Sequence, residues 1–164
     1  MDAIALLKKQ HADVKILFKK FKQSHGPESQ RTTFEAIADS LAAHCEIEEK
    51  LFYPAVFISE LQPLVQEAVE EHLSATRVIA DLLTMEPTHS QFVAKVTVLE
   101  ELIAHHINEE HERMFPVVRE RLTSKELKAL GDSMSVMFDA AMDGKPRRSV
   151  PSQTKSAAAL PLPA

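Results

Sequence analysis

Two segments of the sequence each place a glutamate four residues after a histidine, and each then ends in an aromatic residue followed by proline. The residues of this repeated pattern are His44, Glu48, Tyr53 and Pro54 in the first segment, and His106, Glu110, Phe115 and Pro116 in the second. Residues four apart lie on the same face of a helix, one turn from each other. An imidazole and a carboxylate in this arrangement can reach one point, which is typical of metal ligands.

Both His-Glu pairs continue a stripe of apolar residues at helical spacing, so they should face the core of the protein. The stripes consist of Phe34, Ile37 and Leu41 in the first segment and of Val96, Leu99 and Ile103 in the second. Two further histidines interrupt apolar stripes elsewhere, one before each segment. Each half of the sequence thus supplies two histidines and one glutamate, which are His11, His44 and Glu48, and then His72, His106 and Glu110.

A single buried histidine is more often a hydrogen-bonded core residue than a metal ligand. Four such histidines with two glutamates would, however, put many unpaired polar groups into one core if no cation were bound. The repeat therefore predicts two metal ions, each near the two imidazoles of one half, with the two carboxylates between them. Iron, manganese or zinc suits this mixture of imidazole and carboxylate ligands.

The elements that must position these residues are predicted to be helical. Of the 164 residues 45% are hydrophobic, with three glycines and no tryptophan, as in helical proteins. Apolar spacing predicts long helices at residues 2–23, 28–58, 63–84 and 91–121, and Pro54 should bend or end the second because its ring removes a hydrogen bond. Short connections predict antiparallel neighbours. The expected fold is all-α, an antiparallel up-down four-helix bundle with a short fifth helix near residues 124–142.

Residues 1–143 should form this domain, and residues 144–164 a disordered tail, because Pro, Ser, Ala, Lys and Arg replace the apolar periodicity there. The net charge of −5 and the lack of a long basic cluster argue against a nucleic-acid partner. No apolar run is long enough to span a membrane. A single cysteine, Cys45, excludes an internal disulfide and fits a reducing compartment, so we expect a cytoplasmic protein without a signal peptide.

Taken together, the motifs resemble those of the hemerythrin-like, or HHE cation-binding, family over roughly residues 1–142. The resemblance rests on a lone histidine in the first and third helices and on two His-x3-Glu motifs that end in Tyr-Pro and Phe-Pro. It implies a non-haem di-iron centre, and functions that span oxygen carriage, iron or oxygen sensing, repair of iron–sulfur clusters and peroxide chemistry. It implies terminal ligands at His11, His44, His72 and His106, and bridging carboxylates at Glu48 and Glu110.

One position departs from the pattern of the family's oxygen carriers, which have His-x3-His on the third helix. Here Thr76 follows His72 at that spacing, which argues against reversible oxygen transport. His105 could be a fifth ligand or a partner of a ligand. The spacing to Pro116 favours its neighbour His106 as the residue that faces the core.

Other polar residues adjoin the predicted ligands without continuing the stripes. The sequence favours solvated or supporting roles for the carboxylates Glu49, Glu71 and Glu109. Cys45 is expected to be a small buried apolar residue that points away from His44. Tyr53 fits either a hydrogen bond near the site or a structural role before Pro54. His111 lies off the predicted core face and is assigned no function.

The function expected from the sequence is reaction with, or sensing of, a small oxidant or gas such as oxygen, peroxide or nitric oxide. Two alternatives remain: an iron- or oxygen-responsive regulatory module, and a bundle that zinc holds together without redox chemistry. The sequence leaves open whether turnover is catalytic and what the oligomeric state is.

Overall fold

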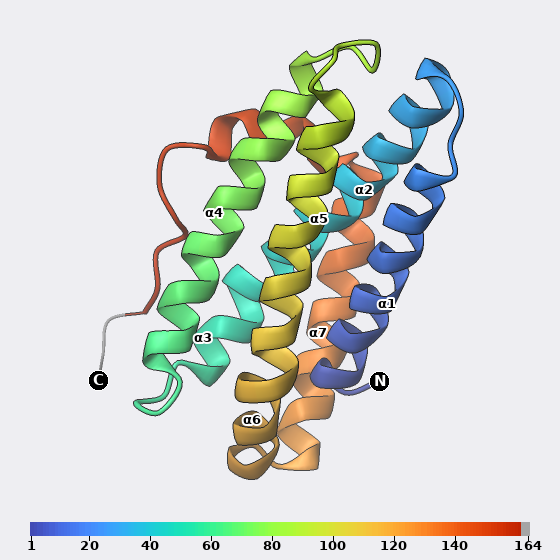
Figure 1. Cartoon of the computed structure of the whole chain (residues 1–164). Coiled ribbons are helices and arrows are strands. Elements are labelled where there is room, and N and C mark those ends of the chain that lie inside the picture. Colours follow the sequence, from blue (N-terminus) through green and yellow to red (C-terminus); the bar gives the residue numbers. More distant parts are fainter. Residues whose placement is uncertain (162–164) are drawn as a thin grey trace.

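The computed structural model describes residues 1–161, and every regular element in that range is helical (Figure 1), which confirms the predicted all-helical class. The α-helices are α1 (Ala3–Lys22), α2 (Pro27–Ile47), α3 (Tyr53–Val56), α4 (Gln62–Thr84), α5 (Phe92–Glu109), α6 (Phe115–Arg121) and α7 (Ser124–Asp143). Figure 1 shows α1 and α4 running in one direction and α2 and α5 in the other. Within residues 1–161 we find no helix with the length and apolar content needed to cross a membrane.

The predicted second and fourth helices are not single α-helices, because each contains one wide turn before its proline. These π-helical turns are η1 (Glu48–Phe52) and η2 (Glu110–Met114), and each begins at a glutamate of the repeated motif. The amide of Tyr53 donates to the Glu48 carbonyl, five residues back, and Phe115 repeats this bond to Glu110. Each proline follows directly, where it has no N–H to donate. The extra residue of the wide turn thus lies next to the point where the proline leaves out a helical hydrogen bond. Wide turns of this kind are frequent at functional sites.

The interior consists of two apolar clusters with a polar layer between them. One cluster includes Leu7, Ile47 and Val69, and the other includes Val14, Leu41 and Ile103. The polar residues of the repeated pattern are buried along the same helices, between residues of the two clusters. The apolar packing on both sides fixes the helices that carry these polar side chains.

Helix α7 covers the residues of the predicted fifth helix and packs along α1 and α2. It begins with the predicted capping box, in which Thr123 and Glu126 bond each other's backbone amides. Gly131, in its middle, touches the start of the chain: a Cβ atom there would lie 2.4 Å from the Met1 carbonyl oxygen and 2.6 Å from the Ala3 nitrogen. The glycine that lowers helix propensity is therefore required by this close approach.

The prediction of a disordered tail differs from the structure over residues 144–161, while residues 162–164 lie outside the described range. A 3₁₀ helix, η3 (Pro146–Gln153), packs against α2 and α4. Val150 is buried, and the Arg147 guanidinium pairs with Asp39 and with Glu35, 2.9 Å away. One apolar and one basic side chain three residues apart share a face of a 3₁₀ helix, so this short segment docks without a long apolar pattern.

Candidate functional site

The structure brings all six predicted site residues together in the polar layer between the apolar clusters. These residues are at most 6% exposed, and they come from α1, α2, η1, α4, α5 and η2: His11, His44, Glu48, His72, His106 and Glu110. Nε2 of His11 lies 3.2 Å from Nε2 of His44, and Nε2 of His72 lies 3.2 Å from Nε2 of His106. The four imidazoles therefore direct the same ring nitrogen toward a common centre.

The glutamates lie between the two histidine pairs. Oε2 of Glu48 is 3.2 Å from Nε2 of both His44 and His72, and Oε2 of Glu110 is 3.3 Å from Nε2 of His11. Two groups of side chains each keep their nearest ligand atoms within 4.8 Å of one another. One group is His11, His44, Glu48 and Glu110, and the other is Glu48, His72 and His106. Glu48 belongs to both, so the arrangement has two adjacent centres that share a carboxylate.

Three buried side-chain polar atoms within residues 1–161 lack a hydrogen-bond partner, and two of them belong to the site glutamates. They are Oε1 of Glu48, Oε2 of Glu110 and Nε2 of Gln10. A buried carboxylate oxygen without a donor is costly, and a cation is the partner that would satisfy it. The donor set of imidazole nitrogens and carboxylate oxygens fits iron, manganese or zinc.

The charges in the layer are balanced by protons when no metal is bound. Burial alone would raise the pKa of Glu48, yet the surrounding histidines, His44 first, hold it well below its usual range. Burial would lower the pKa of His106, but Glu110 and the nearby carboxylates raise it to about 10. The pKa of His11 falls to about 4, mainly because burial disfavours its charged form. The raised pKa values of His72 and His106 and the lowered values of His11 and His44 therefore leave the protons on the second pair of histidines, where a metal ion would replace them.

Each site histidine also has a partner on its outward nitrogen, Nδ1. The partner atoms are Nε2 of His111 for His11 (2.9 Å), Oε1 of Gln10 for His44 (2.7 Å), Oε1 of Glu49 for His72 (2.9 Å) and Oε1 of Glu71 for His106 (3.5 Å). Such partners fix the tautomer and the orientation of a metal-binding imidazole. They leave Nε2 free to face the centre.

Sequence reasoning predicted some of these partners and missed others. Glu49 and Glu71 were candidates for supporting roles, whereas Gln10 gave no signal beyond its place next to His11. His111 was placed off the core face, but the wide turn η2 contains it and its ring reaches His11. His105 does not join the centre: its side chain is 63% exposed, with Nε2 3.5 Å from Glu71.

Tyr53 lies inside the site rather than beside it. Its hydroxyl is 3.1 Å from Oε1 of Glu110, 3.3 Å from Oε2 of Glu48 and 3.3 Å from Nε2 of His72. Its side chain is fully buried. The residue that matches it in the second half of the chain, Phe115, has no polar atom, so only one side of the site has a hydroxyl donor.

Comparisons with known proteins agree with this geometry. Residues 2–118 match the family described as the hemerythrin HHE cation-binding domain. A protein named DNA nickase from Nostoc sp. (strain PCC 7120 / SAG 25.82 / UTEX 2576) is 27% identical over 121 residues, which are 74% of this chain but 34% of that protein. The chain thus spans about a third of the length of this curated relative.

A solved structure also has the same fold. It is the hemerythrin HHE cation-binding domain-containing protein from Mycobacterium kansasii that is described as an Rv2633c homolog, and it superimposes with a TM-score of 0.81 at 23% identity. The alignment covers 93% of this chain and 99% of the other. At this identity the likeness concerns the arrangement of the helices.

Proposed function

Because the chain belongs to the family of hemerythrin HHE cation-binding domains, we propose that it holds two iron ions in a non-haem centre and reacts with or senses a small oxidant or gas. The ligands would be the four histidines and two glutamates of the polar layer, which are His11, His44, His72, His106, Glu48 and Glu110. Oxygen, peroxide and nitric oxide are the candidate reactants.

The observation that carries this proposal is the pair of buried ligand groups that share Glu48. Two groups of ligands suit two ions, and the six side chains cannot fill every position of two six-coordinate ions. Positions would remain for a small molecule, which is what reaction at a metal requires. Thr76 adds no nitrogen to this set. The proposed function therefore leaves out reversible oxygen carriage, for which a further imidazole would protect one ion.

The residues of the chain supply binding, orientation and protection from water. Iron, when bound, would supply electron transfer to the oxidant. The partners on Nδ1 hold the imidazoles, and the two apolar clusters keep bulk water from the layer. Burial raises the pKa of Tyr53 well above its usual value, and Glu110 and Glu48 add to this effect, so the hydroxyl keeps a proton beside both glutamates.

The partners we propose are small molecules rather than nucleic acid or membrane, in keeping with a net charge of −5. The name DNA nickase belongs to a protein of which the match covers only 34%, and nothing in the site resembles a phosphate-binding surface. Zinc as a purely structural ion, and a regulatory module that transmits a signal, are the other candidates.

Metal analysis with an optical spectrum of anaerobically reconstituted protein tests the proposal. We expect two iron ions per chain and an absorption change when the reduced protein meets oxygen or peroxide. Saturation at one ion, or zinc binding with no reaction by iron-loaded protein, would contradict the proposed function. Glu48→Ala and Glu110→Ala should each lower the stoichiometry if the carboxylates are shared.

A further inference from the structure

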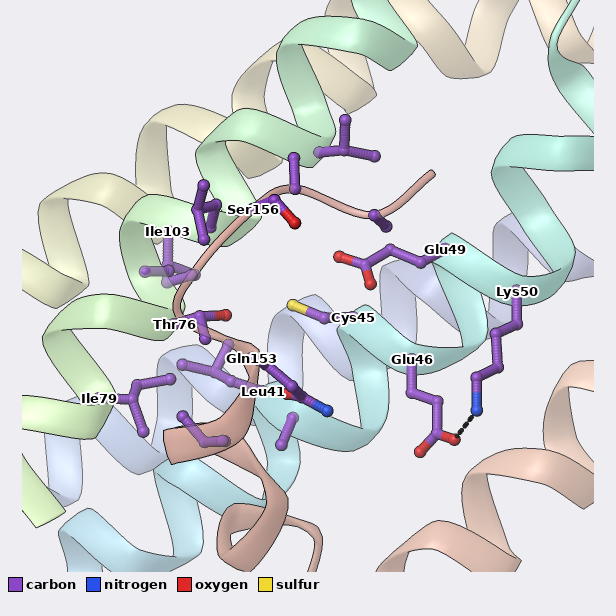
Figure 2. Close-up of a pocket in the computed structure, with 17 residues that line it drawn as sticks. Leu41, Cys45, Glu46, Glu49, Lys50, Thr76, Ile79, Ile103, Gln153 and Ser156 are labelled. Carbon is purple, nitrogen blue, oxygen red and sulfur yellow. Dashed lines mark hydrogen bonds and ion pairs between the residues drawn. The ribbon is translucent and has the colours of Figure 1, made fainter. Parts of the chain in front are cut away.

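A cavity of about 220 Å³ lies between α2 and α4 beside the polar layer (Figure 2). Its walls include Leu41, Cys45 and Glu49 from α2 and η1, and Thr76 and Ile79 from α4. The C-terminal segment covers it with Gln153, Ser156, Ala157 and Ala158. Since a water molecule takes up about 30 Å³ in the liquid, the cavity has room for several small molecules.

A second, much smaller cavity of about 10 Å³ lies at the site itself and is lined by His11, His44, His72 and His106. Three residues line both cavities: Leu41, Cys45 and Ile103. The outer cavity is therefore separated from the ligand histidines by one thiol and two aliphatic side chains. Such a layer yields to small molecules by side-chain motion and offers a charged one only the weak hydrogen-bond donor of a thiol.

The polar groups of the outer cavity disfavour anions. Figure 2 shows the thiol of Cys45 and the carboxylate of Glu49 projecting into the space beneath the C-terminal segment. Glu49 also accepts a hydrogen bond from Nδ1 of His72, so its charge is fixed beside the site. Lys50 is paired with Glu46 and cannot offset this charge. The cavity thus presents a carboxylate to anything that enters.

Two arginines fasten the segment that covers the cavity. Arg77 of α4 donates to the carbonyls of Thr154, at 3.0 Å, and Lys155, at 3.4 Å. Arg147 pairs with Asp39 and Glu35 of α2. The segment is therefore bonded to α4 through Arg77 and to α2 through Arg147, while small side chains such as Ser156 and Ala157 face the cavity. It covers the opening without filling it.

We propose that this cavity is the entrance by which a small uncharged oxidant reaches the metal site, with Leu41, Cys45 and Ile103 as the junction and the C-terminal segment as a size-selective cover. The inference rests on the proposed function and adds to it the substrate class, a neutral molecule such as peroxide or oxygen. Anionic and bulky reductants would be kept from the iron.

The first test uses labelling of Cys45, the one cysteine of the sequence, and needs no activity. Folded protein, with and without iron, is treated with neutral methyl methanethiosulfonate and with the larger anionic sulfonatoethyl reagent, and each rate is divided by that of the denatured chain. We expect the neutral reagent to be favoured about tenfold, as repulsion of an anion by a nearby carboxylate implies. Equal normalised labelling rates for the two reagents, or no labelling of folded protein by either one, would contradict the proposed entrance.

The cover is tested by Arg77→Ala in the full chain. Losing these bonds should raise the rate for the bulky reagent and so reduce the preference for the neutral one. Arg121→Ala is the matched control, because this arginine pairs with Glu60 and is absent from the cavity lining. A preference unchanged in Arg77→Ala would show that the segment does not control access.

Two substitutions on different helices test the junction. Cys45→Leu on α2 and Ile103→Phe on α5 each place a larger side chain between the two cavities. Both should keep two metals per chain, yet react with peroxide about tenfold more slowly, which corresponds to a barrier about 1.4 kcal/mol higher. Cys45→Ala should react no more slowly than the wild type. If both narrowed variants react at the wild-type rate with full metal content, the entrance lies elsewhere. If the iron-loaded wild type reacts with no oxidant, the proposed function fails, and the labelling rates still decide whether the cavity admits neutral molecules.

Discussion

The hydroxyl of Tyr53 lies 3.1 Å from Oε1 of Glu110, so a side chain from the first half of the chain contacts the glutamate of the second half. In the matching position, the ring of Phe115 stacks on His11 at an interplanar angle of 9°. The site histidines and glutamates therefore repeat between the halves, but their hydrogen-bonding surroundings do not. Only the side of the site next to Tyr53 therefore has a hydroxyl group that can hold a proton.

Tyr53→Phe should preserve the metal site and slow its reaction. The substitution removes the hydroxyl but keeps the buried ring, so we expect two metals per chain as in the wild type. Loss of a positioned proton donor typically costs about 100-fold or more in rate, and even a partial role should be visible in stopped-flow mixing with peroxide. Phe52→Leu, which alters packing next to Tyr53, is the control. An unchanged rate in Tyr53→Phe would assign the tyrosine a packing role alone.

Glu49→Ala should weaken metal binding, because Glu49 fixes the ring of His72 through Nδ1. Removing a partner of this kind costs about 10- to 100-fold in metal affinity. Competition with a chelator of known affinity measures the loss. Glu46→Ala is the matched control three residues earlier, since Glu46 pairs with Lys50 rather than with a histidine. Equal losses in the two variants would mean that general charge, and not orientation of His72, is responsible.

Metal binding should release protons. The pKa of His106 is about 10, and that of His72 is raised well above its usual value. At pH 7 both rings are therefore charged in the metal-free protein. A metal takes the neutral imidazole and the ionised carboxylate. Burial and Glu48 raise the pKa of Glu110 to about 7, so this carboxyl is partly protonated as well, and we expect release of about two to three protons per chain. Calorimetry in two buffers of different ionisation enthalpy gives the number. Because protons compete with the metal, the apparent affinity should rise with pH through neutrality; an affinity that falls would refute the charge assignment.

The clustering of the six polar side chains could be predicted from the sequence, because polar residues that face a helical core repeat with the same period as the apolar residues around them. His44 and Glu48 continue one stripe, and this spacing survives in the structure. The hydrogen-bond partners do not follow that period. Gln10 reaches His44 from the neighbouring helix, and His111 lies in a turn that the π-helical geometry widens. No spacing rule for regular α-helices would place them.

The C-terminal segment escaped prediction for a different reason. Its composition is that of a linker, and its contacts depend on a 3₁₀ turn that puts Arg147 and Val150 on the same side. Both side chains are largely buried against helices that lie far away in the sequence. Tertiary packing, and not local pattern, orders this segment.

Val150→Ala should therefore lower the stability of the protein. Removing two buried methyl groups costs about 1.5 kcal/mol, which corresponds to a fall of about 3–6 °C in Tm for a chain of this size. Val136→Ala is the control, since Val136 is 72% exposed. Calorimetry of both variants decides the point. An unchanged Tm in Val150→Ala would return the segment to the disordered tail that composition suggests.

His105, which precedes the second motif, and His111, which lies within it, should differ in their effect on metal binding, in the opposite order to that suggested by the sequence. His111 contacts Nδ1 of His11 at 2.9 Å, so His111→Ala should let that ring rotate and lower the metal affinity about 10- to 100-fold. His105 is 63% exposed and reaches only Glu71, so His105→Ala should leave two metals bound with nearly wild-type affinity. His111→Gln, which can keep a hydrogen bond to His11, should recover part of the loss. Chelator competition and the iron spectrum measure all three variants. A greater loss in His105→Ala than in His111→Ala would make His105 a ligand and reverse the assignment of this side of the site.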